Sequence, residues 1–341
     1  MNSANDGTET ARFSLLQESD RTGKGRFYDS SFISEYGRLE AVRSERYGIP
    51  FSIVVLHVES FHGGKVPDKK TLLAFLKTLV RSVHKVIRSC DITGILGDKS
   101  IIILLPHTDY FGSLITIKKL SRALEFLTKE EPHASLFLSQ ATFPKDASGF
   151  GELVSTATAR ISERIRSQWE KLELRSKLFW ETVAVLTGTN LDQSDLSTFD
   201  VGPDHDLGNS FLQRINETVL QEIRRKPEKK GILYIGAKKI SKDLPIVDSL
   251  NSLGRTSTKI FLVGEGRQAG CDVKNATAIY LADHRLLTTY FTLFLSEDMA
   301  YGLICRESWG DAHNCFHTSD PYVVESLITK FQRDYTLQEQ L

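Results

Sequence analysis

The chain has 341 residues, of which 40% are hydrophobic and 25% charged, a composition typical of a globular protein with about two domains. Its 43 basic and 43 acidic side chains cancel, so no net field attracts nucleic acid or anionic lipid, and an anionic ligand needs a local basic cluster. The longest apolar runs fall far short of the ~20 residues that a membrane-crossing helix needs, and four cysteines without repeated spacing are typical of a reducing cytoplasm.

After a polar tail at residues 1–19, helix-like and strand-like segments alternate. Apolar residues with helical spacing predict helices over 29–47, 72–87 and 113–127. Runs rich in β-branched residues predict strands over 51–58, 91–96, 101–105 and 136–142. The short turn at 97–100 joins two of these strands into a hairpin. We therefore expect a first α/β domain over residues 20–168, with one sheet covered by helices.

The connection to the second half is rich in charge. Residues 150–186 keep a helical pattern and predict one long helix that closes the first domain and runs on as a connector. Two copies of the chain could pair through this helix to form a homodimer. Residues 188–210 are acidic, rich in Gly and Ser, and aperiodic, which is typical of a linker. The connector and linker together span 169–209.

The second half repeats the α/β alternation over residues 210–338. Helical spacing predicts helices over 211–225, 244–253 and 321–335. Short apolar runs predict strands over 232–235 and 259–263 and a hairpin formed by 289–295 and 301–305. This part is expected to form a second, smaller α/β domain.

Three segments of the first half resemble the GGDEF family of diguanylate cyclases. They are Thr22-Gly23, RYGIPFSIVVLHVESF at 46–61, and RSCDITGILGDKSIIILLP at 88–106; ATFP at 141–144, before a long helix, also fits. The family condenses two GTP molecules into cyclic di-GMP in bacterial signalling. The resemblance covers about residues 20–168 and implies a nucleotide-cyclase-like sheet with covering helices.

The family signature aligns with the turn of the hairpin, which reads Gly97, Asp98, Lys99, Ser100 and Ile101. The second glycine of the signature, where backbone approaches phosphate, is replaced by aspartate. The acidic metal ligand is replaced by lysine, and the catalytic glutamate by serine. Shifting the alignment by one position makes Asp98 a ligand but places Lys99 at the catalytic glutamate.

Two further positions depart from the pattern that the resemblance implies. The metal-binding aspartate at the end of the first strand is His57, and the guanine-binding asparagine falls at Lys65. Exchanging an acid for Lys99 alters the local charge by two units, and each unit within ~4 Å is worth about 4 kcal/mol at an effective dielectric of ~20. We therefore expect no bound metal, no cofactor and no enzymatic activity.

One family feature is retained. Some GGDEF domains bind cyclic di-GMP at an Arg-x-x-Asp motif just before the signature, and Arg88-Ser89-Cys90-Asp91 stands at that spacing. An arginine can bind phosphate or guanine, and a carboxylate can accept hydrogen bonds from guanine. The supporting base of the family maps to Lys119. Alternatively, Arg88 and Asp91 only cap or bridge the chain locally.

Segments of the second half resemble the DICT sensory domain found beside bacterial cyclases. They are GILYIGAKKI at 231–240, KIFLVGEGRQ at 259–268, the hairpin at 290–307 and FHTSDPYVVESLITKFQ at 316–332. This resemblance implies a sensory role and no specific chemistry.

The sequence thus predicts a cytoplasmic bacterial signalling protein, an inactive GGDEF-type receptor or regulatory module for cyclic di-GMP coupled to a sensory domain. A protein of a signalling pathway is the expected partner, and nucleic acid is not. The first alternative is an interaction scaffold that binds no nucleotide, with Arg88 and Asp91 purely structural. The second is residual diguanylate cyclase activity.

Overall fold

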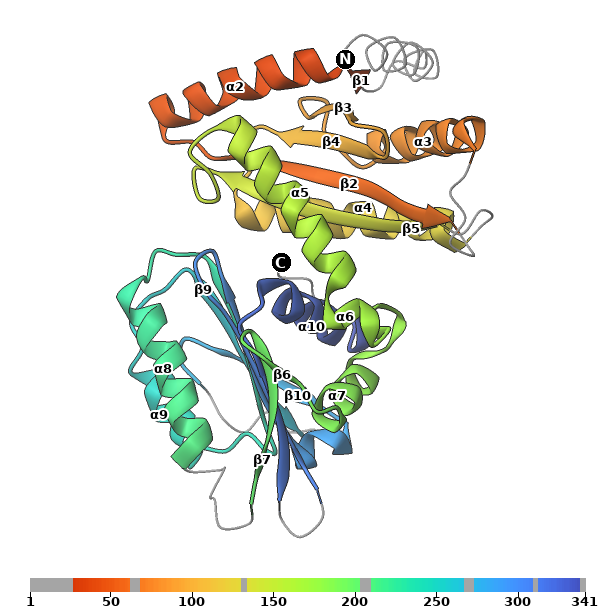
Figure 1. The fold of residues 1–341 in the computed structure, drawn as a ribbon. Helices are drawn as coiled ribbons and strands as arrows, with labels where there is room; N and C mark the ends of the chain where they lie inside the picture. Colours follow the sequence, from red (N-terminus) through yellow and green to blue (C-terminus); the bar gives the residue numbers. More distant parts are fainter. Residues whose placement is uncertain are drawn as a thin grey trace. The chain divides into compact units, whose positions relative to one another are not determined.

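The computed structural model of the protein describes residues 27–61, 68–129, 134–202, 210–266, 273–308 and 312–337 (Figure 1). The predicted tail, Thr22-Gly23 and Lys65 lie outside these residues. The chain divides into two compact units between Lys171 and Leu172. Both units are mixed α/β, as predicted, and each is described by itself.

The first unit contains a five-stranded sheet with the order β1-β3-β4-β2-β5. β1 runs parallel to β3, and the other neighbours are antiparallel. The central strand β2 is rich in Ile, Val and Leu because it is covered on both faces. The strands are β1 (Phe27–Tyr28), β2 (Phe51–Phe61), β3 (Ile92–Leu96), β4 (Ser100–Leu105) and β5 (Ala134–Phe143).

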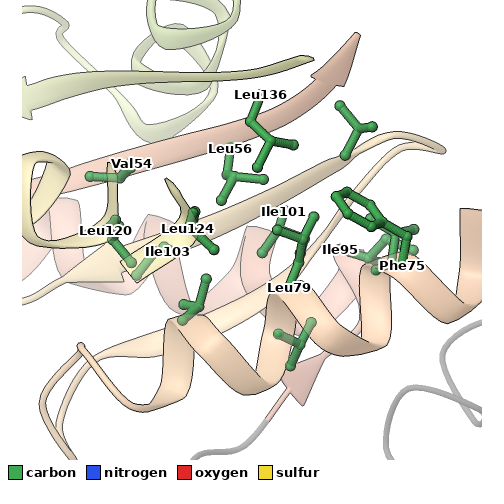
Figure 2. Packing of buried hydrophobic residues seen from close by; sticks show 14 of the residues in the cluster. Val54, Leu56, Phe75, Leu79, Ile95, Ile101, Ile103, Leu120, Leu124 and Leu136 are labelled. Carbon is green, nitrogen blue, oxygen red and sulfur yellow. The ribbon is translucent and has the colours of Figure 1, made fainter. Parts of the chain in front are cut away.

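Two pairs of helices cover the two faces of this sheet. The first pair packs on a core that includes Leu56, Leu79 and Leu120, shown in Figure 2. The second pair packs on the opposite face, around Ile53 and Leu153. The first pair is α3 (Lys69–His84) and α4 (Tyr110–Lys129), and the second is α2 (Ser30–Tyr47) and α5 (Phe150–Arg166).

Helices α2 and α5 approach closely at Gly37. A Cβ atom built on Gly37 would lie 2.3 Å from the ring of Phe150, a contact that no side chain tolerates without movement. Gly94 in β3 is equally confined, since its Cβ would lie 2.3 Å from Ile33. Glycine at these two positions therefore allows α2 to pack against both the sheet and α5.

The predicted single helix over 150–186 is wrong. The backbone of Ser167 is extended (φ −64°, ψ 157°), which ends α5, and its hydroxyl accepts the backbone N–H of Glu170 at 3.4 Å. This Ser-x-x-Glu pattern starts a new helix because the serine side chain satisfies a free N–H group of its first turn. The pieces are α5, α6 (Gln168–Lys171), η1 (Leu174–Ser176) and α7 (Phe179–Gly188), so the helix expected to pair two copies is not continuous.

The second unit contains an eight-stranded sheet with the order β10-β9-β8-β11-β12-β13-β7-β6. The first three strands of this order are parallel to one another, and every other neighbour is antiparallel. The strands are β6 (Asp192–Gln193), β7 (Leu196–Val201), β8 (Gly231–Ala237), β9 (Thr258–Glu265), β10 (Thr277–Leu281), β11 (Thr289–Ser296), β12 (Ala300–Glu307) and β13 (His313–Thr318).

The predicted linker at 188–210 is also wrong in its middle part. Residues 196–201 form β7, which pairs with β13 from Leu196 opposite Thr318 to Val201 opposite His313. Both ends of the strand are buried, so this acidic segment contributes directly to the sheet of the second unit.

Helices cover both faces of the second sheet (Figure 1). α8 (Leu212–Arg225) and α9 (Pro245–Asn251) pack on one face around Leu233 and Phe294. α7 and α10 (Pro321–Asp334) pack on the other, where Phe179, Phe291 and Phe331 are in mutual ring contact. Among the residues that the structure describes, none of the helices is long and apolar enough to span a membrane.

A hydrogen-bonded network joins α7, α10 and the short helix η3 (His284–Thr288). The indole of Trp180 donates to the hydroxyl of Tyr335 at 2.5 Å, and that hydroxyl donates to Asp283. The guanidinium of Arg285 donates to both carboxylate oxygens of Asp283, at 2.6 and 2.9 Å. Chiefly because of Arg285, the pKa of Asp283 is lowered to about 2.

Candidate functional site

The β3–β4 hairpin contains residues 97–101, of which Gly97 and Asp98 are exposed in the turn and Ile101 is buried in β4. Gly97 adopts a left-handed backbone conformation (φ 67°), which glycine tolerates without strain. The space around its Cβ position is open. Leu96 pairs with Ser100, and residues 97–99 form the turn between them. The sequence predicted this hairpin correctly.

His57 and Ser100, where the sequence predicts a lost metal ligand and a lost catalytic glutamate, are in direct contact. They are paired across β2 and β4, and Nδ1 of His57 shares a 2.8 Å hydrogen bond with the hydroxyl of Ser100. Nε2 of His57 lies 3.1 Å from a carboxylate oxygen of Glu59. The polar atoms of these side chains are therefore occupied with one another.

Lys99 places a positive charge beside this group. Its carbonyl accepts the backbone N–H of Val58 at 2.9 Å, and its ammonium group lies 3.4 Å from the carbonyl oxygen of Glu59. A cation at this point opposes the binding of a dication through unfavourable Coulomb energy. Within the described ranges, no cluster of three or more His, Cys, Asp or Glu residues could hold a metal ion.

The Arg88–Asp91 motif forms a tight turn between α3 and β3. The carboxylate of Asp91 accepts the backbone N–H of Arg88 at 2.7 Å, and the backbone N–H of Asp91 donates to the carbonyl of Arg88 at 3.2 Å. Asp91 is only 9% exposed, and burial raises the pKa of its carboxyl group. The carboxylate thus has a structural role, which holds the turn in place.

The two cations of the predicted binding site are both accessible. Arg88 is exposed at the turn, and Lys119 is exposed on α4, the helix that packs beside α3. Ile95, which stands two residues before Gly97 in β3, is buried in the core between β3 and α3 (Figure 2). Its side chain is consequently unable to contact a ligand at the surface.

Glu59 is the residue of this region that the sequence analysis did not single out. It lies two positions after His57 on β2, so the two side chains are on the same side of the strand. The sequence indicates only that His57 and Glu59, two residues apart on a strand, have side chains on the same side. The contact between them is shown by the structure.

Comparison with known proteins gives structural matches only. No protein-family model matches the chain, and no curated protein is similar to it in sequence. The GGDEF domain of YfiN from Pseudomonas aeruginosa is 11% identical; the match covers 41% of this chain and 91% of that one, with a TM-score of 0.35.

Two further solved structures show comparable similarity. A DGC protein from Thermotoga maritima is 11% identical over 43% of this chain and 98% of that one, with a TM-score of 0.34. A microbial GGDEF domain, studied for its interaction with cyclic di-GMP, is 20% identical over 45% of this chain and 92% of that one, with a TM-score of 0.34. These structures are similar to less than half of the chain.

Proposed function

We propose that the first unit is a GGDEF-type module that has lost cyclase activity and acts as a receptor for cyclic di-GMP in bacterial signalling. The observation that carries the loss of catalysis is the group formed by His57, Lys99 and Ser100. In the family that the sequence resembles, these three positions carry acidic side chains. Here they carry an imidazole, an ammonium group and a hydroxyl, and the imidazole of His57 hydrogen-bonds to the hydroxyl of Ser100. Such a group offers no anionic oxygen for magnesium.

The surface that would bind the nucleotide is the turn at Arg88. Cyclic di-GMP carries two phosphate charges and two guanine bases, and an exposed guanidinium can bind either group with two hydrogen bonds. One carboxylate oxygen of Asp91 accepts the backbone N–H of Arg88, its other oxygen would accept from a guanine edge, and Lys119 supplies a second cation from α4. We therefore assign Arg88, Asp91 and Lys119 as the contact residues.

Calorimetric titration of the protein with cyclic di-GMP tests this assignment. We expect saturable binding with a micromolar Kd, weakened about five- to 150-fold in Arg88→Ala, because one bidentate pair contributes on the order of 1–3 kcal/mol. Lys85→Ala, which removes another exposed cation at the end of α3, is the matched control and should leave the Kd unchanged. Absence of binding at high micromolar ligand would contradict the receptor function.

One observation favours a second candidate function, an interaction scaffold that binds no nucleotide. The 2.7 Å hydrogen bond from the backbone of Arg88 to Asp91 gives the motif a complete structural role without any ligand. In that case the first unit would present its surface to a protein of the signalling pathway, and the second unit would act as the sensor. A calorimetric titration with cyclic di-GMP that shows no binding heat, on a protein that is still folded, would favour this function.

Residual cyclase activity is tested separately. Incubation with GTP and Mg²⁺ or Mn²⁺, followed by chromatography, should yield no cyclic di-GMP above a protein-free control, since Lys99 disfavours a dication at the site. Formation of the product in proportion to protein concentration would show that catalysis survives. This outcome is independent of the binding experiment.

We place the protein in the bacterial cytoplasm, where GTP and cyclic di-GMP are found.

A further inference from the structure

Helix α2 has apolar residues on two opposite sides. One side faces the interior, where Ile33, Gly37 and Ala41 are buried. The other side exposes large apolar side chains: Leu39 is 41% exposed and Val42 is 52% exposed. A soluble surface helix normally carries one apolar stripe, so the second stripe calls for a partner.

The outer stripe has the spacing of a coiled-coil seam. It consists of Phe32, Glu35, Leu39, Val42 and Arg46, which are separated by three, four, three and four residues. Such alternation keeps side chains along one line that a second helix can follow. Leu39 and Val42 form its apolar centre, with an acid on one side and a base on the other.

The stripe of one copy is complementary in charge to the stripe of a second copy that runs in the opposite direction. In an antiparallel pair, Leu39 of one copy faces Val42 of the other, and Glu35 faces Arg46. Beside the seam, Arg38 faces Glu45. A parallel pair would instead place Glu35 against Glu35 and Arg46 against Arg46, which is repulsive.

The charged ends of the stripe are available for such pairing. Glu35 bonds to Arg38 within its own helix at 2.8 Å, but both side chains are 61% exposed. An exposed pair of this kind contributes little to stability and can be exchanged for contacts with another chain. Arg46 lies over the ring of Tyr47 at 5.3 Å, also at the surface.

From this self-complementary pattern we propose that two copies of the chain associate through antiparallel packing of their α2 helices. The shared surface is one face of an 18-residue helix from each copy. It is smaller than the roughly 800 Å² per partner of a standard interface, so the dimer is expected to be weak, with a Kd in the micromolar range. This association is independent of nucleotide binding.

Sedimentation velocity of the full chain over about 2–200 μM protein, in low salt, tests the proposal. The unmodified chain should shift from monomer toward dimer across this range. Glu35→Arg alone and Arg46→Glu alone should each weaken association at least tenfold, because each places like charges opposite one another. The double variant Glu35→Arg/Arg46→Glu restores the opposite charges and should regain the dimer.

Lys85→Glu makes the same type of charge change on α3, away from the stripe, and should leave association unchanged. Circular dichroism of each variant checks that the fold is intact. A chain that stays monomeric at all concentrations would overturn the proposal. So would a dimer that is insensitive to the single reversals, or a double variant that remains as weak as the single ones.

Discussion

Replacing Gly37 with alanine is expected to lower the free energy of unfolding of the first unit by about 2 kcal/mol. Alanine normally stabilises a helix by about 1 kcal/mol relative to glycine. Here the added methyl group would lie 2.3 Å from the ring of Phe150, so α2 and α5 must separate or the ring must leave its position. Overpacking of this kind costs about 3 kcal/mol, which outweighs the gain in helix propensity.

Gly151→Ala is the matched control, since Gly151 is also in a helix, next to Phe150, and has open space around its Cβ position. That variant should be neutral or stabilised by up to about 1 kcal/mol. Urea unfolding followed by circular dichroism measures both, and hydrogen exchange assigns the loss to the first unit. Adding Phe150→Leu to Gly37→Ala should recover part of the stability. Equal stability of the two alanine variants would refute the packing argument.

Replacing Asp283 with asparagine is expected to destabilise the second unit by about 2 kcal/mol at neutral pH. The pKa of Asp283 falls from 3.8 to about 2 in the folded chain; at 1.36 kcal/mol per pKa unit this shift corresponds to about 2 to 3 kcal/mol, which solvent screening at the 60% exposed Arg285 reduces to about 2 kcal/mol or less. Asparagine keeps the shape but removes the charge that Arg285 binds with two hydrogen bonds. Tyr335→Phe removes one hydrogen bond to Asp283 and also the acceptor of the Trp180 indole N–H, and each lost bond should cost about 1 kcal/mol.

The pH dependence of this effect has a defined sign. Because the folded pKa lies below the unfolded value, the unfolded chain binds more protons between pH 2 and 3.8. The contribution of Asp283 is therefore complete above pH 3.8 and is lost as the pH falls to about 2. The difference in unfolding free energy between the original chain and Asp283→Asn should shrink over this range. A difference that stays constant with pH would show that the charge of Asp283 is not the cause.

The elements with strong apolar periodicity could be predicted from the sequence. The hairpin β3–β4 and the helices α8 and α10 match their predicted positions to within a few residues. The single helix over 150–186 could not be predicted correctly, because its many charges support helix formation on both sides of Ser167. The side-chain cap at that serine interrupts it first, and the left-handed conformation of Glu173 and the extended backbone of Leu178 interrupt it again.

Strand β7 was missed for a different reason. Its sequence, Leu-Ser-Thr-Phe-Asp-Val, has apolar residues at its ends but sits in an acidic segment rich in Gly and Ser. It becomes a strand because β13 offers a partner that lies more than one hundred residues later in the chain. Such long-range pairing determines strands that local propensity does not show.

The candidate site was predictable in its residue types but not in its geometry. The residue types at His57, Lys99 and Ser100 can be read directly from the sequence. The hydrogen bond between His57 and Ser100 depends on strand pairing, and the hydrogen bond from the Arg88 backbone to the Asp91 carboxylate depends on a turn. They therefore had to come from the structure.

The pairing of β7 with β13 also determines where the chain can be cut. A fragment that starts at Ser210 would keep β13 but lose its neighbour, leaving a row of N–H and C=O groups along a newly opened sheet edge. Open edges of this kind recruit strands from other molecules, so such a fragment should aggregate. A fragment that starts at Leu172 retains α7, β6 and β7, so β13 keeps its neighbour and we expect no aggregation through this edge.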